Sequence, residues 1–184
     1  MTDRQILFSR PFPVAELSGE PTLLSIAATT AECDVLAVDL GLSALSDFAI
    51  DFQIIKRPGD HVLVEGELRA RMTQICVVTL DPFETSLVAP IRVEFASPEA
   101  VAAAVAARPP REPRPGDPPE DQPDPPDPII AGRVDLGLVA TEFLALSLDP
   151  YPRKPGVAFS APPAAEEPDE SPFAALARLK RDEN

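Results

Sequence analysis

The stretch from Phe48 to Ala70, FAIDFQIIKRPGDHVLVEGELRA, decides the fold class. Apolar and polar residues alternate on both sides of a central Lys56–Asp60 segment. Alternation with a period of two is typical of a strand with one buried face, and Pro-Gly-Asp is typical of a turn. The stretch therefore predicts two antiparallel strands joined as a β-hairpin.

Further strands are predicted on both sides of this hairpin. Residues 24–28 and 87–95 alternate in the same way, and the β-branched run from Thr73 to Leu80 also favours a strand, which Asp81-Pro82 interrupts. Several consecutive strands with short turns are typical of antiparallel sheets. We expect an antiparallel β-meander or a small barrel.

Two helices are predicted beside these strands. Thr29 and Glu32 fit a capping box in front of an apolar stripe over residues 30–40, and Gly41 can end that helix. Asp135 can cap a second helix that runs to about Leu148. Helices packed on an antiparallel sheet give the predicted fold class, α+β.

Proline divides the chain into regions. The chain has 24 prolines in 184 residues, and ten of them lie in the 21 residues of 108–128. That segment holds no large aliphatic or aromatic residue, which predicts a disordered insertion that acts as a semi-stiff spacer. A proline-rich ligand for a groove-type domain is the alternative. We expect one α+β domain over 1–107 and 129–159, followed over 160–184 by an acidic flexible tail with a short terminal helix.

Charge and composition narrow the function classes. Thirty acidic and sixteen basic residues give a net charge of −14, which disfavours a broad nucleic-acid-binding or membrane-binding surface. No apolar run is long enough for a membrane helix, and the first residues do not resemble a secretory signal. Cys33 and Cys76 lie far apart and are expected to be reduced thiols. The expected location is the cytoplasm.

Patterns that indicate catalysis are missing from the sequence. One histidine, His61, and two cysteines cannot supply a typical zinc site, and the glycines form no phosphate-binding loop. Cys76 is expected in a buried strand as a small hydrophobic residue, and Cys33 in the core. A nucleophilic role for Cys76 would need a nearby base or helix N-terminus, which the sequence does not show. We therefore expect no catalytic residue, no metal and no cofactor.

The best candidate for binding is the segment Asp149–Gly156, DPYPRKPG. Its prolines stiffen the backbone and hold Tyr151 next to Arg153 and Lys154. A tyrosine can stack on a base while the two cations contact phosphates, as suits a single-stranded loop of RNA. An acidic protein groove would also fit. The alternative is a rigid turn in which Tyr151 packs back on the core.

Two motifs in this order resemble one family. The segment Gln74–Phe83, with Cys76, Leu80 and Pro82, resembles the central Cys-x-x-x-Leu-x-Pro segment of YceD-like proteins, the bacterial large ribosomal RNA subunit accumulation proteins. The helix with Asp135, Leu136 and Glu142, together with residues 149–156, resembles the second signature of that family and its alphaproteobacterial branch. The resemblance covers roughly residues 5–107 and 129–180. Many relatives carry a second cysteine where this chain has Thr79, so a thiol pair does not transfer.

The resemblance implies a role in the synthesis, processing or stability of 23S ribosomal RNA, with no established catalytic residues. With a net charge of −14, RNA contact would have to be local. The candidate contacts are Tyr151, Arg153 and Lys154, with Arg69, Arg71 and Arg92 on the strands. The alternative is an acidic adaptor that binds a basic partner, such as a ribosomal protein or assembly enzyme, without touching RNA. The oligomeric state is not predicted.

Overall fold

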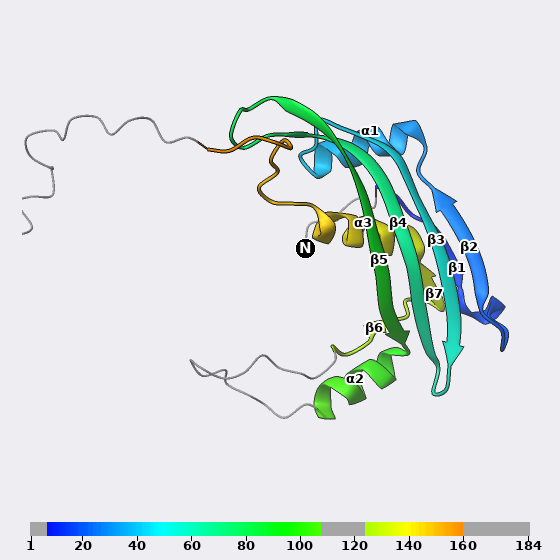
Figure 1. Cartoon of the computed structure of the whole chain (residues 1–184). Coiled ribbons are helices and arrows are strands. Elements are labelled where there is room, and N and C mark those ends of the chain that lie inside the picture. Colours follow the sequence, from blue (N-terminus) through cyan, green and yellow to red (C-terminus); the bar gives the residue numbers. More distant parts are fainter. Residues whose placement is uncertain (1–6, 108–123, 160–184) are drawn as a thin grey trace, which may run out of the picture.

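The computed structural model describes residues 7–107 and 124–159 of the chain (Figure 1). The predicted spacer falls mostly on residues 108–123, and the predicted tail on 160–184, which lie outside the described residues. The elements are, in chain order, β1 (Pro11–Pro13), a short 3-10 turn (Val14–Glu16), β2 (Thr22–Ala27), α1 (Thr30–Asp39), β3 (Ala44–Arg57), β4 (His61–Ile75), β5 (Pro82–Ala96), α2 (Pro98–Ala107), β6 (Asp127–Pro128), β7 (Arg133–Asp135) and α3 (Leu136–Ser147).

The main sheet has five strands in the order β2-β3-β4-β5-β6. The first four pair antiparallel, and β6 adds in parallel at the end of β5. The predicted α+β class and meander are confirmed, whereas the barrel alternative is wrong because the sheet stays open. The two residues of β6 lie inside the segment 108–128 that was predicted as an insertion, so its last residues belong to the sheet.

The hairpin that decides the fold forms as predicted between β3 and β4. Ile54 lies opposite Val64, and Arg57 lies opposite His61 across the turn. The turn needs two residues with left-handed backbone, and Gly59 and Asp60 have φ angles of 77° and 59°. Glycine adopts this conformation without a steric cost, and aspartate tolerates it better than most residues.

The predicted capping of both helices is confirmed. Thr29 and Glu32 form the capping box of α1, and Gly41 follows that helix with a φ of 67°. Asp135 caps α3 by accepting hydrogen bonds from the backbone N–H groups of Gly137 and Leu138. Side-chain oxygens at these positions satisfy N–H groups that have no partner within the helix.

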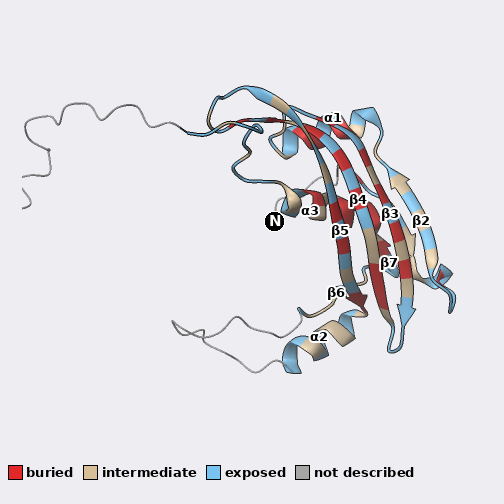
Figure 2. Ribbon diagram, viewed as in Figure 1, coloured by how far each residue is buried: buried red, intermediate tan, exposed pale blue. Residues whose placement is uncertain are grey.

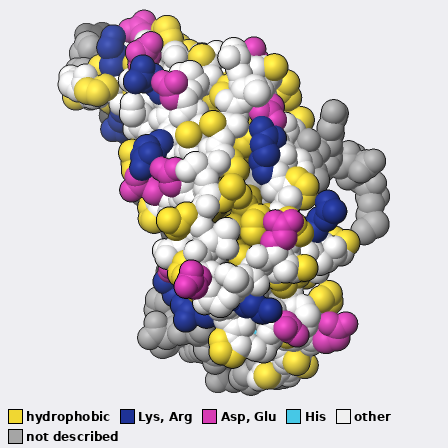
Figure 3. All heavy atoms as spheres, turned by 90° about the vertical axis from the view of Figure 1, so that its right-hand side faces the viewer, with side chains coloured by type: hydrophobic (Ala, Val, Ile, Leu, Met, Phe, Trp, Pro, Cys, Tyr) yellow, Lys and Arg dark blue, Asp and Glu magenta, His cyan; other side chains and the backbone are white. Residues whose placement is uncertain are grey.

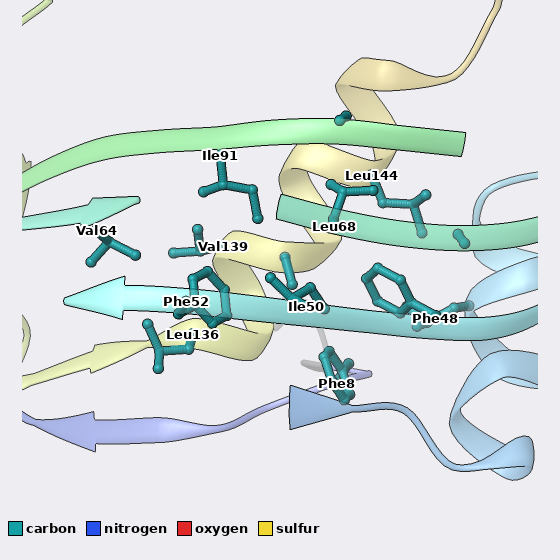
Figure 4. Close-up of a cluster of buried hydrophobic side chains, with 14 of the residues drawn as sticks. Phe8, Phe48, Ile50, Phe52, Val64, Leu68, Ile91, Leu136, Val139 and Leu144 are labelled. Atoms are coloured by element: carbon teal, nitrogen blue, oxygen red, sulfur yellow. The ribbon is translucent and has the colours of Figure 1, made fainter. Parts of the chain in front are cut away.

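The core lies between the concave face of the sheet and α3. Figure 2 shows the buried residues alternating along β3, β4 and β5 and continuing on α3. In Figure 4 the side chains of α3 point toward those of the sheet, with Phe8 closing one end. The large buried side chains include those of Phe8, Leu36, Phe48, Ile50, Phe52, Ile54, Leu68, Ile91, Leu136 and Leu144. This aliphatic and phenylalanine core fixes α3 across the sheet, and with it the start of the segment that follows the helix.

The N-terminal segment ties α1 and α3 together. β1 pairs with β7 directly before α3, and the Arg10 guanidinium binds Glu32 of α1 through two hydrogen bonds of 2.9 Å. Arg10 also lies 4.4 Å over the ring of Phe8. Hydrogen bonding to Arg10, followed by that to the N–H of Thr29, lowers the pKa of Glu32 to about 2. Within the described ranges, no helix combines the length and apolarity that a membrane crossing requires.

A candidate binding corner at the tip of the long hairpin

Two segments that are far apart in sequence meet at the tip of the β4–β5 hairpin. The first is the loop Cys76–Asp81, and the second is Asp149–Gly156, which follows α3 (Figure 1). The N–H of Val77 donates to the carbonyl of Pro152 at 2.9 Å, and the N–H of Lys154 donates to the Sγ atom of Cys76 at 3.4 Å. We call these two segments together the corner. It joins both motifs that the sequence singled out.

Cys76 lies in the loop and not in a strand, which corrects the sequence prediction. β4 ends at Ile75, and Cys76 closes the loop by donating its N–H to Asp81 and accepting from the N–H of Leu80, both at 2.9 Å. The β-branched run imitates a strand, but the left-handed backbone of Leu80, with a φ of 61°, turns the chain there. The thiol is nevertheless fully buried, as expected of a small hydrophobic residue.

The Cys76 thiol is surrounded by hydrogen-bond donors that the sequence did not reveal. The backbone N–H of Lys154, followed by the hydroxyl and N–H of Thr79, lowers the pKa of Cys76 to about 6. Neither a base nor a helix N-terminus is needed for this, because backbone N–H groups stabilise the thiolate directly. Since Cys76 is inaccessible, its role in the fold is to hold the two segments together. Cys33 is in the core as predicted, and burial raises its pKa.

The surface of the corner is apolar and exposed. Leu80 has 74% of its surface exposed and Tyr151 has 71%, while Val77 is 45% exposed. The interpretation that Tyr151 packs on the core is therefore wrong. Instead its N–H bonds to the Asp149 carboxylate at 2.9 Å, in a turn that directs the aromatic ring outward. A leucine held in left-handed backbone and also exposed is the kind of strained feature that concentrates at binding sites.

The corner also holds two cations, Arg153 and Lys154, together with the exposed carboxylates of Asp81 and Asp149. Arg153 and Lys154 are both exposed, and no carboxylate of the described residues lies within ion-pair distance of either side chain. The patch therefore combines an exposed aromatic ring with two cations that form no ion pair with another described residue.

The other three candidate arginines lie elsewhere and are compensated. They occupy the outer face of β4 and β5, where Figure 3 shows basic side chains beside acidic ones. The ion pairs are Arg69 with Asp51 and Glu67, Arg71 with Asp47, and Arg92 with Glu65. Arg69 and Arg71 share a strand face as expected, but their charge is balanced there. A contact between RNA and these three arginines stays a prediction.

The remaining motif residues have structural positions. Asp135 is the cap of α3, Leu136 is fully buried, and Pro82 begins β5. Glu142 is exposed on α3 and lines a groove beside β5. Sequence reasoning missed Val77, and it singled out Leu80 as a motif residue but not its left-handed backbone or its exposure; the only local signal was the Asp81-Pro82 turn that follows.

Comparison with known proteins agrees with the two motifs. The family model described as large ribosomal RNA subunit accumulation protein YceD matches residues 64–180, which is more than half of the chain and includes both parts of the corner. No curated protein and no solved structure matches this chain. The resemblance noted from the motifs is thereby confirmed: the chain belongs to the YceD family of large ribosomal RNA subunit accumulation proteins.

Proposed function

We propose that this protein is a non-catalytic cytoplasmic factor that supports the synthesis, processing or stability of 23S ribosomal RNA, and that it contacts RNA through the corner. The observation that carries this proposal is the pair of exposed cations, Arg153 and Lys154, which form no ion pair with another described residue and lie beside the exposed ring of Tyr151. The family to which the chain belongs links it to RNA of the large ribosomal subunit.

The size of the corner fits a short unpaired stretch of RNA. Stacking of one base on an aromatic side chain contributes about 1–3 kcal/mol, and it tolerates any base sequence. Two phosphate contacts predict a shallow salt dependence, an affinity loss of about sevenfold between 50 and 200 mM salt for a single strand. The net charge of −14 supports contact at one small place, because the rest of the surface repels phosphates.

Two features of the corner support a binding role over a catalytic one. Cys76, whose pKa is lowered to about 6, is fully buried, and its sulfur accepts a hydrogen bond from the backbone N–H of Lys154. The side chains that reach solvent there are an aromatic ring, aliphatic groups, the cations of Arg153 and Lys154 and the carboxylates of Asp81 and Asp149, of which Asp149 accepts a hydrogen bond from the Tyr151 N–H.

The experiment is a charge reversal at the corner, Arg153→Glu with Lys154→Glu, in the full chain. The matched control is Lys56→Glu with Arg57→Glu. It reverses two exposed cations beside the β3–β4 turn, which lies at the other end of β4 from the corner. Binding is measured with single-stranded fragments of 23S ribosomal RNA. We expect the corner variant to bind at least tenfold more weakly and the control to stay within threefold of the wild type. Equal binding by both folded variants would refute RNA contact at the corner.

A cellular measurement tests the wider role. Lysates with and without the gene are separated on a sucrose gradient, and the protein is located across the fractions. We expect it to travel with precursors of the large subunit, and its loss to deplete free large subunits. A normal ribosome profile, with the protein at the top of the gradient, would contradict the proposed role.

A further inference from the structure

One long edge of the sheet, that of β5, has no partner strand over most of its length among the described residues. β4 covers one side of β5. On the other side, among the described strands, β5 pairs with β6 through Phe95 and Ala96. The N–H of Ile129 donates to the carbonyl of Ala96 at 2.8 Å, so the backbone groups of Ala96 face this edge. Because strand backbone groups alternate and the β4–β5 register is unbroken, those of Glu84, Ser86, Val88 and Arg92 face it too. Among the described strands, none pairs with β5 on this side before Phe95.

Pro90 supports this assignment of the edge. A proline has no N–H to donate and is tolerated in a strand where its nitrogen faces away from the neighbouring strand. Pro90 lies opposite Glu67 of β4, in the same alternating series as Ser86 and Val88. The edge therefore offers N–H donors on both sides of Pro90 and an unbroken row of carbonyl acceptors.

A groove with an apolar floor runs beside this edge. It lies between β5, β6 and α3, and its volume of about 1120 Å³ exceeds the roughly 300–1,000 Å³ of small-molecule pockets. Figure 1 shows α3 passing behind β5, with the C-terminal end of the helix beyond the strand. Leu138, in the first turn of α3, is 49% exposed, and Leu146, near the C-terminal end, is 75% exposed; both line the groove. An added strand would cover them.

The groove is acidic. Its lining includes five carboxylates, those of Glu94, Asp124, Asp127, Asp135 and Glu142, against the guanidinium groups of Arg92 and Arg133. Two of the carboxylates already have partners, because Asp135 caps α3 and Glu94 lies 2.8 Å from Nδ1 of His61. Arg92 already binds Glu65 on the outer face of the sheet. A phosphate backbone would be repelled here, whereas lysine and arginine side chains would be attracted.

We propose that the groove beside β5 binds an extended basic segment of a partner protein, which adds a strand to the open edge and places alternate apolar side chains on α3. Backbone hydrogen bonds to β5 provide affinity, and the acidic rim with the Leu138 and Leu146 floor provides selectivity. This site is separate from the corner, and the proposal does not rest on RNA contact there. It identifies a surface through which an acidic assembly factor could hold a basic protein.

The probe is a labelled ten-residue peptide that alternates lysine and valine, and its counterpart alternates glutamate and valine. Fluorescence anisotropy measures binding to the full chain. We expect the lysine peptide to bind the wild type, and Leu146→Asp and Ser86→Pro each to weaken binding at least tenfold. Ser86→Pro removes an N–H donor from the edge. It should keep the pairing with β4, because Pro90 occupies an equivalent position in the same strand and is paired there. Leu23→Asp, at a 77% exposed leucine on the opposite edge, is the matched control and should not change binding.

Amide hydrogen exchange locates the contact. The lysine peptide should slow the exchange of the Ser86 and Val88 N–H groups, which face the edge, and leave that of Leu87, which faces β4, unchanged. Equal binding of the glutamate peptide, or less than twofold loss in both groove variants, would overturn the proposal. A dimer of the wild type in sedimentation that Ser86→Pro makes monomeric would assign the edge to a second copy and would also overturn it.

Discussion

The substitution Gly137→Ala tests how the N-terminal segment is docked on α3. A Cβ atom at this position would lie 2.6 Å from the Phe8 carbonyl oxygen and 2.9 Å from the Arg10 nitrogen. Both are backbone atoms, so no side-chain rotation can relieve the contact, and overpacking of this kind costs about 1–3 kcal/mol. A shift of the segment also breaks the hydrogen bonds from the Arg10 N–H to Asp135 and from the Leu136 N–H to Arg10.

The magnitude follows from three terms. Each lost hydrogen bond costs about 0.5–1.5 kcal/mol, and the better helix propensity of alanine returns up to about 1 kcal/mol. The net destabilisation is therefore about 3 kcal/mol, taken from the middle of these ranges. For a chain of this size, a loss of that order lowers Tm by about 6–12 °C.

Urea unfolding of the full chain, followed by far-ultraviolet circular dichroism, measures this loss. The matched control is Gly19→Ala, because a Cβ atom at Gly19 has no heavy atom within 4 Å. We expect the control to be as stable as the wild type or slightly more stable, since alanine restricts the unfolded chain. If Gly137→Ala unfolds at the same urea concentration as the wild type, the segment is not packed against α3 as closely as the structure shows.

Three further predictions concern single residues. The pKa of Cys76 is lowered from 9.0 to about 6 in the fold, so its contribution to stability is full above pH 9 and is lost as the pH falls through 6. The free energy of unfolding should therefore rise between pH 6 and 9, and this rise should shrink in Cys76→Ser when both proteins are unfolded with urea across that range. The pKa of Glu32 is lowered from 4.5 to about 2, first by Arg10, so Glu32→Gln should be less stable than the wild type at pH 7, and the difference should disappear as the pH falls through 2. Leu80→Gly should stabilise the protein by about 0.5 kcal/mol, because the relief of left-handed strain exceeds the cost of the freer unfolded chain, yet it should weaken binding at the corner. If thermal unfolding shows the glycine variant to be less stable, the leucine is not strained there.

Local chemistry explains which elements could be predicted from the sequence. The capping box of Thr29 and Glu32, the cap at Asp135 and the turn at Gly59 all act within a few residues, so their signals are continuous in the chain. Whether the sheet closes into a barrel depends instead on whether β2 meets the far edge. Such a contact would join segments that are distant in the sequence, so no local sequence pattern predicts whether it forms. The open sheet was accordingly left undecided by the sequence.

The loop at Cys76 shows why a strong pattern can mislead. Its β-branched residues favour a strand, but the pairing of Ile75 with Pro82 forces the chain to turn between them. The turn is held from outside by Pro152 and Lys154, which lie more than 70 residues further along the chain. A tertiary contact therefore overrides the local β-propensity. The same contact lowers the pKa of the thiol, so neither the loop nor its chemistry could be read from residues 73–80 alone.

The distribution of charge at the candidate sites depends on strand register in the same way. Arg92 looks like a free basic residue in the sequence, because its partner Glu65 is 27 positions away. The register that starts with Ile75 opposite Pro82 places Arg92 opposite Glu65, and the two charges compensate each other. Arg153 and Lys154 follow α3 in a proline-stiffened segment that pairs with no described strand, and neither forms an ion pair with another described residue. Sheet pairing thus neutralises Arg69, Arg71 and Arg92, and it places no such partner opposite Arg153 and Lys154.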